Sequence, residues 1–89
     1  MSKLTFLVVE DDLFYRKYLS DLLAGSEVEV ITAEDGETGL ALALSERPDL
    51  IITDIEIPRM QGFALLRNIR EHPGIKETPV ILMSGKVEK

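Results

Sequence analysis

Short apolar runs and longer segments with helical periodicity alternate along this chain of 89 residues. Two of the runs, residues 4–9 (LTFLVV) and 49–53 (DLIIT), lack regular polar alternation, which is typical of strands buried on both faces of a parallel sheet. Residues 79–83 (PVILM) form a third apolar run that predicts a strand. Residues 28–32 alternate between apolar and acidic side chains, which favours a strand nearer the sheet edge. The pattern therefore predicts four strands.

The three segments between these strands carry apolar side chains at helical spacing. In residues 13–24 they form two neighbouring rows: Phe14, Tyr18 and Leu22, then Tyr15, Leu19 and Leu23. A second helix is predicted from Asp35 through Glu46, and a third from Phe63 through Ile69, ending near His72. Asp12 and Asp35 are predicted as N-caps of the first two helices, and Gly25 is predicted to end the first.

Strands and helices alternate along the whole chain. Such an α/β order implies right-handed crossovers and a doubly wound parallel sheet with helices on both faces. The sequence contains no internal repeat and no Ser/Gly-rich linker. At this length we therefore expect a single domain over residues 1–89.

Charge and composition narrow the range of functions. With 16 Asp and Glu against 10 Lys and Arg, the formal net charge is −6, which disfavours direct binding to nucleic acid or to a membrane surface. The first apolar run is too short for a signal peptide or a membrane span, so we expect a cytoplasmic protein. Because the chain has no cysteine, the metal ions to consider are hard cations held by oxygen ligands.

Acidic side chains follow two of the buried strands. Glu10, Asp11 and Asp12 follow the first, whereas Asp54 and then Glu56 follow the third. The carboxyl ends of neighbouring parallel strands meet at one sheet edge, where ligands bind in folds of this class. Converging carboxylates suit Mg²⁺ or Mn²⁺. Taken alone, the acidic triplet is equally well explained as a solvated turn in which Asp12 caps the next helix.

The sequence resembles the receiver domain of bacterial two-component response regulators. The matching segments are FLVVEDD at 6–12, DLIITDIEIPRMQG at 49–62 and PVILMSG at 79–85. The most specific part is the pattern D-x-x-x-P-x-M-x-G formed by Asp54, Pro58, Met60 and Gly62. The resemblance implies a flavodoxin-like sheet, shortened here to four strands in the order 2-1-3-4 and three helices.

By this resemblance, Asp54 is the phosphoacceptor for a sensor histidine kinase or a phosphotransfer protein. Asp11 and Asp54 are expected to ligate Mg²⁺, with the backbone carbonyl of Glu56 as a third ligand and Glu10 reaching the metal directly or through water. Ser84 is expected to hydrogen-bond the phosphoryl group and to act as a switch. The domain is not expected to be an enzyme beyond assisting its own phosphorylation and dephosphorylation.

The last helix, strand and helix of the family pattern, including its Lys-Pro, have no matching residues, so we expect a domain that is incomplete at its C-terminus. Lys86 is expected to be a solvated residue of the tail. The exposed fourth strand, or the sheet face left uncovered, suggests a homodimer. The alternative function is therefore a metal-binding interaction or dimerisation module that is not phosphorylated. Arg16 and Lys17 are expected on the solvent side of the first helix.

Overall fold

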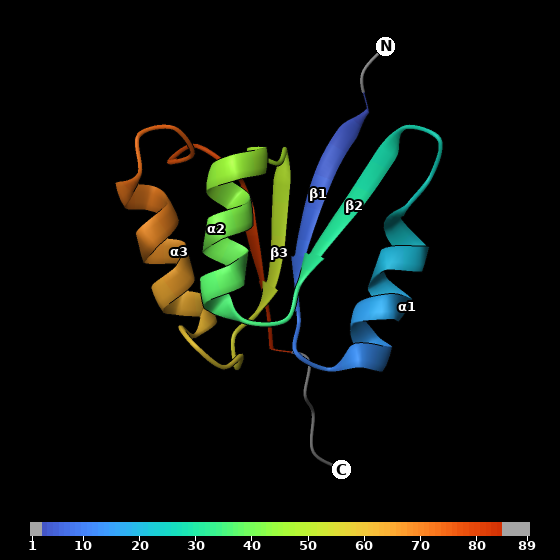
Figure 1. Ribbon diagram of the computed structural model, residues 1–89, viewed down its shortest axis with the longest axis horizontal. Helices are drawn as coiled ribbons and strands as arrows, with labels where there is room; N and C mark the ends of the chain where they lie inside the picture. The colour runs from blue at the N-terminus through green and yellow to red at the C-terminus, as the bar shows by residue number, and fades with distance from the viewer. Residues whose placement is uncertain (1–2, 85–89) are drawn as a thin grey trace.

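The computed structural model describes residues 3–84, in which strands and helices alternate as predicted (Figure 1). The elements are β1 (Leu4–Val9), α1 (Leu13–Leu23), β2 (Val28–Ala33), α2 (Gly36–Glu46), β3 (Leu50–Asp54), α3 (Gly62–Glu71) and β4 (Val80–Met83). None of the helices in this described part of the chain has the length and apolar character that crossing a bilayer requires. The predicted boundary at Lys89 and the placement of Lys86 lie outside the described residues.

The four strands form one parallel sheet in the order β2-β1-β3-β4, which confirms the predicted topology. β1 and β3 occupy the centre, and Val8 of β1 stands in register with Ile52 of β3. The central strands lack polar alternation because side chains on both of their faces are covered. β4 also lacks it, but this strand lies at the edge of the described sheet and is only partly buried. Leu7, Val8 and Val9 are all fully buried.

Helices cover both faces of the sheet: α2 and α3 lie side by side on one face, and α1 lies on the other, against β1 and β2 (Figure 1). The main core lies beneath α2 and α3. Its buried members are Leu7, Val9, Ala33, Ala43, Ile51, Ile57, Leu65, Ile69 and Ile75. On the α1 face, Val8 and Ile52 are buried, but Ile81 of β4 is 49% exposed. Coverage on that face therefore decreases toward β4.

Both predicted N-caps are confirmed. Oδ1 of Asp12 accepts a hydrogen bond from the Phe14 amide at 3.2 Å, and Oδ1 of Asp35 accepts one from the Thr38 amide at 2.7 Å. The end of α1 differs slightly from expectation. The helix stops at Leu23 because Ala24 adopts an extended backbone, and Gly25 then pairs with Val28 at the start of β2.

The loop between β3 and α3 is held at both ends. The Gly62 amide donates to the Ile55 carbonyl at 2.8 Å, and the Gly36 amide at the start of α2 donates to the Pro58 carbonyl at 3.0 Å. Between these bonds, Arg59 and Met60 adopt left-handed backbone angles, with φ of 53° and 87°. Each such residue costs on the order of 1 kcal/mol, which the surrounding contacts must offset. The loop that follows Asp54 is therefore closely specified.

Gly62 lies against the backbone of Asp54 and Ile55. A Cβ added at this position would lie 2.5 Å from the Asp54 carbonyl oxygen and 2.9 Å from the Ile55 Cα. Since both neighbours are backbone atoms, we expect Gly62→Ala to lower the free energy of unfolding by about 1–3 kcal/mol. Urea denaturation measures this change. Gly25→Ala is the control, because an added Cβ there meets no atom within 4 Å. Equal stability of the two variants would contradict the steric argument.

The cap of α2 predicts an acid-sensitive contribution to stability. The hydrogen bond from the Thr38 backbone is the largest cause that holds the pKa of Asp35 below its usual value of 3.8. A carboxyl group with a depressed pKa in the folded state stabilises the fold above its unfolded pKa, and this stabilisation is lost as the pH falls through the folded pKa. We expect Asp35→Asn, which keeps an acceptor oxygen, to reduce the loss of thermal stability below about pH 4.

The measurement is the melting temperature of both proteins between about pH 6 and pH 3. Glu46→Gln, which removes a carboxyl group from the other end of α2, is the control and is expected to behave as the unmodified chain does. A profile for Asp35→Asn that matches the unmodified chain over the whole range would show that the cap does not contribute this pH dependence.

Candidate functional site

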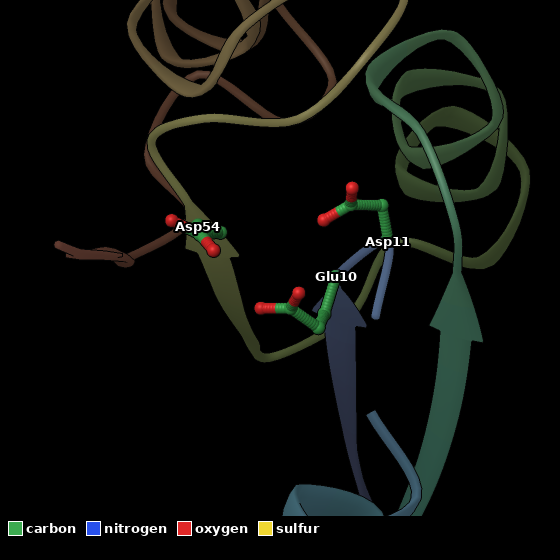
Figure 2. Close-up of side chains that lie close together, drawn as sticks. All are labelled: Glu10, Asp11 and Asp54. Carbon is green, nitrogen blue, oxygen red and sulfur yellow. The ribbon is translucent and has the colours of Figure 1, made fainter. Parts of the chain in front are cut away.

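Three carboxylates converge at one edge of the sheet. Glu10 and Asp11 directly follow β1, and Asp54 is the last residue of β3. Because these strands are parallel neighbours, their carboxyl ends meet, and carboxylate oxygens from all three residues lie within 4.8 Å of one another. Figure 2 shows the side chains of Glu10 and Asp11 directed toward the side of Asp54. The predicted convergence is confirmed for these three residues.

Glu10 is fully buried, and the turn between β1 and α1 is built around it. Its amide donates to the Ala33 carbonyl at the end of β2, at 3.0 Å. Its Oε2 accepts from the Asp12 amide at 2.9 Å, and its carbonyl accepts from Nη1 of Arg16 at 2.8 Å. The bond to Oε2 offsets part of the cost of burying this carboxylate, and the two backbone bonds fix Glu10 in the turn.

Asp54 is only 3% exposed and ends the apolar strand β3. Its Oδ1 accepts from the Glu56 amide at 3.3 Å, while the hydroxyl of buried Thr53 donates to the Asp54 carbonyl at 3.0 Å. The next amide, that of Ile55, donates to the Met83 carbonyl on β4 at 3.0 Å. The carboxylate is thus bonded by the backbone that follows it, and that backbone is in turn bonded to the end of β4.

A hollow of about 210 Å³ opens beside Asp54 and is lined by Asp54, Ile55, Glu56 and Ser84. Ser84 directly follows β4 and is exposed, so the structure brings it to the same hollow as Asp54. The side chain of Glu56 is exposed, and its amide is the group that bonds Asp54. Within the described residues, the hollow therefore joins the ends of β3 and β4.

The acidic triplet has two separate tasks. Glu10 and Asp11 join the cluster with Asp54, whereas Asp12 lies outside the group of three and caps α1. The expected convergence thus holds for Glu10 and Asp11, and the expected helix cap holds for Asp12. The position of Asp12 at the start of a helix accounts for its separation from the cluster.

The donor atoms of the cluster fit a hard divalent cation. All three side chains offer carboxylate oxygens, with neither imidazole nor thiolate among them. This donor set suits Mg²⁺ or Mn²⁺. Asp11 is exposed, so a cation can reach the cluster from solvent, while buried Glu10 and Asp54 form its inner side.

Sequence reasoning missed the position of Arg16. The prediction that Arg16 and Lys17 both lie on the solvent side of α1 is confirmed for Lys17, which pairs with Asp21 at 3.4 Å with both side chains largely exposed. For Arg16 it is wrong, because this side chain is half-buried and bonds the Glu10 carbonyl. One signal was available: long side chains in a helix lean toward its N-terminus, and Arg16 follows the cap Asp12 by about one turn.

The carboxylate cluster is expected to destabilise the metal-free protein. Two like charges about 4 Å apart repel by about 1 kcal/mol in water, and Asp11 is exposed to water. We therefore expect Asp11→Asn to raise the metal-free free energy of unfolding by about 1 kcal/mol. We also expect MgCl₂ to stabilise the unmodified chain and Asp11→Asn to remove most of that stabilisation. Thermal denaturation with and without MgCl₂ measures both effects.

The matched control is Asp12→Asn. This substitution changes the net charge equally, lies one residue away and keeps a good N-cap, but it leaves the cluster intact. It is expected to leave the response to MgCl₂ unchanged. If both variants lost that response equally, net charge rather than the cluster would be responsible.

The chain is similar to many proteins of one family. The family model for the response regulator receiver domain matches residues 6–89. The chain is 40% identical over 81 residues to the two-component response regulator ORR3 of Oryza sativa subsp. indica, covering 90% of this chain and 62% of the relative. It is 39% identical over 90 residues to protein-glutamate methylesterase/protein-glutamine glutaminase 3 of Geobacter sulfurreducens, covering 99% of this chain and 24% of the relative.

Solved structures agree with these sequence matches. The chemotaxis response regulator CheY4 of Vibrio cholerae superimposes with a TM-score of 0.85 at 34% identity, covering 91% of this chain and 68% of the other. A receiver domain of a signal transduction histidine kinase from Syntrophus aciditrophicus superimposes with a TM-score of 0.83 at 32% identity, covering 89% of this chain and 60% of the other. The chain thus spans less than two thirds of the curated relatives named above.

Proposed function

Because this chain belongs to the response regulator receiver domain family, we propose that Asp54 accepts a phosphoryl group in two-component signalling. The observation that carries this proposal is the buried carboxylate of Asp54 at the end of β3, within 4.8 Å of the Glu10 and Asp11 oxygens and beside an open hollow. A buried nucleophile among acids, with a way in from solvent, fits phosphoryl transfer better than it fits a structural role.

The proposed step is a displacement at phosphorus. A carboxylate oxygen of Asp54 attacks the phosphorus of a phosphohistidine, forming a P–O bond as the P–N bond breaks. The electron pair of the P–N bond goes to the departing imidazole, which carries a proton, and the product is an aspartyl phosphate. The bond from the Glu56 amide to Oδ1 fixes the orientation of the attacking carboxylate. The hydroxyl of Ser84 is proposed to donate to a phosphoryl oxygen.

Glu10, Asp11 and Asp54 are proposed to hold Mg²⁺ or Mn²⁺ together with the backbone carbonyl of Glu56. The cation supplies positive charge that offsets the negative charge of the phosphoryl oxygens and of the cluster itself. The oxygen-only donor set supports this assignment. The rest of catalysis then consists of holding Asp54 in place and admitting the donor from the open side of the hollow.

The proposed donor is a sensor histidine kinase or a phosphotransfer protein, and the signal leaves by conformational change or protein contact. Some relatives are named as methylesterases, but this chain matches under a quarter of the Geobacter sulfurreducens protein. We propose that the domain itself is a phosphoacceptor and has no enzymatic activity beyond its own phosphorylation and dephosphorylation. A cytoplasmic location and the lack of direct nucleic-acid or membrane binding stay predictions.

Acetyl phosphate tests the phosphoacceptor role without a cognate kinase. With MgCl₂ present, we expect intact-mass spectrometry to show one added phosphoryl group on the unmodified chain and none on Asp54→Asn. Asp49→Asn is the matched control, since Asp49 precedes the same strand at its other end and accepts a hydrogen bond from the Thr5 amide. It is expected to be phosphorylated normally. Adduct formation on Asp54→Asn, or none on the unmodified chain, would overturn the assignment.

The same experiment addresses the second candidate, a metal-binding interaction or dimerisation module that is not phosphorylated. The observation that favours it is the exposure of large apolar side chains: Phe14 is 82% exposed, Leu22 63% and Tyr18 58% on α1, and Ile81 is 49% exposed on β4. A homodimer through β4 or through this sheet face belongs to that candidate. A chain that binds Mg²⁺ but takes up no phosphoryl group would favour it.

A further inference from the structure

We infer that Arg16 is a positioning residue for the metal centre: its guanidinium holds the Glu10–Asp11 peptide in the orientation that lets both side chains reach the cation. This inference rests on the proposed metal binding by the carboxylate cluster. The observation behind it is the hydrogen bond from Nη1 of Arg16 to the Glu10 carbonyl, 2.8 Å long and formed by a half-buried side chain.

The bond acts on the peptide unit that carries two of the proposed ligands. A peptide group is planar, so the Glu10 carbonyl, the Asp11 amide and the Cα atoms of both residues move together. Holding the carbonyl oxygen therefore limits rotation of the whole plane. Since the side chains of Glu10 and Asp11 leave from the two ends of that plane, their directions toward Asp54 depend on its orientation.

The backbone of Arg16 is held within α1. Its amide donates to the Asp12 carbonyl at 2.9 Å, and the hydroxyl of Ser20 donates to its carbonyl at 2.8 Å. Asp12 in turn donates its amide to Oε2 of Glu10. The start of α1 thus makes two hydrogen bonds to Glu10: Asp12 bonds its carboxylate, and Arg16 bonds its carbonyl. A charged donor makes the second bond stronger than a neutral one would.

The charge of Arg16 and its hydrogen bond predict opposite effects on metal binding. A nearby positive charge repels a cation, so loss of the charge alone would strengthen binding of Mg²⁺. Loss of the bond releases the peptide plane and weakens binding, because ligands that are no longer held must be ordered when the metal arrives. The direction of the change therefore separates the two roles.

Arg16→Met removes both the charge and the donor while keeping a long side chain. We expect it to weaken Mg²⁺ binding by about 10- to 100-fold, the usual effect of removing a group that orients a metal ligand. Arg16→Lys keeps a charged N–H donor that can restore part of the bond to the Glu10 carbonyl, but it lacks the guanidinium geometry. We therefore expect it to bind more tightly than Arg16→Met and more weakly than the unmodified chain. Lys17→Met, at the next position on the solvent side, is the control and is expected to leave the affinity unchanged.

Affinity is measured from the shifts of amide resonances in a titration of the 89-residue chain with MgCl₂. The ¹³C resonance of the Glu10 carbonyl, recorded without metal, reports the hydrogen bond directly. It is expected to move in Arg16→Met and to stay in place in Lys17→Met. Metal-free melting temperatures of all variants show how much of any change reflects stability alone.

Several outcomes overturn the inference. If the unmodified chain does not bind Mg²⁺, both the proposed metal site and this inference fail. If it binds but Arg16→Met binds as well or more tightly, only the inference fails, and the same holds if the melting temperature falls while the affinity is unchanged. If Arg16→Met does not fold, Arg16→Lys decides: affinity equal to that of the unmodified chain counts against positioning, and weaker affinity supports it.

Discussion

The parallel pairing of β1 with β3 is the constraint on which the site depends. Both strands run in one direction through the centre of the sheet, so whatever follows them must meet at one edge. The apolar side chains of Leu7 and Ile51 secure that pairing by complete burial. In this chain the residues that meet are acids, and burial of the core keeps together charges that repel one another. The stability of the apolar core therefore compensates for the repulsion among these carboxylates.

The region around Asp54 is connected to the helices by backbone as well as by side chains. The Pro58 carbonyl, in the loop after β3, accepts a hydrogen bond from the Gly36 amide at the start of α2. The Gly62 amide, at the start of α3, donates to the Ile55 carbonyl. At the opposite side of the site, the first turn of α1 bonds Glu10 through Asp12 and Arg16. The N-terminal ends of α1 and α2, on opposite faces of the sheet, are thus bonded to the segments that carry the cluster or follow it.

Most of the fold could be predicted from the sequence because apolar periodicity reports burial. The uninterrupted runs marked the central strands β1 and β3 as well as the edge strand β4, and the strand order followed from the resemblance to receiver domains. The strand ends also located Asp54, Glu10 and Asp11. What could not be predicted depends on local geometry: Ala24 leaves the helix one residue early, and Arg16 bends back to a carbonyl six positions before it. Such contacts of one long side chain leave no periodic trace in the sequence.

β3 and β4 are joined at the end that carries Asp54. Within residues 3–84, β3 has a hydrogen-bonded neighbour on each side, whereas β4 pairs with β3 alone. The Ile55 amide joins the end of β3 to the Met83 carbonyl, and Ser84 follows immediately. A movement of the backbone after Asp54 would therefore act on Met83 and, one residue later, on Ser84.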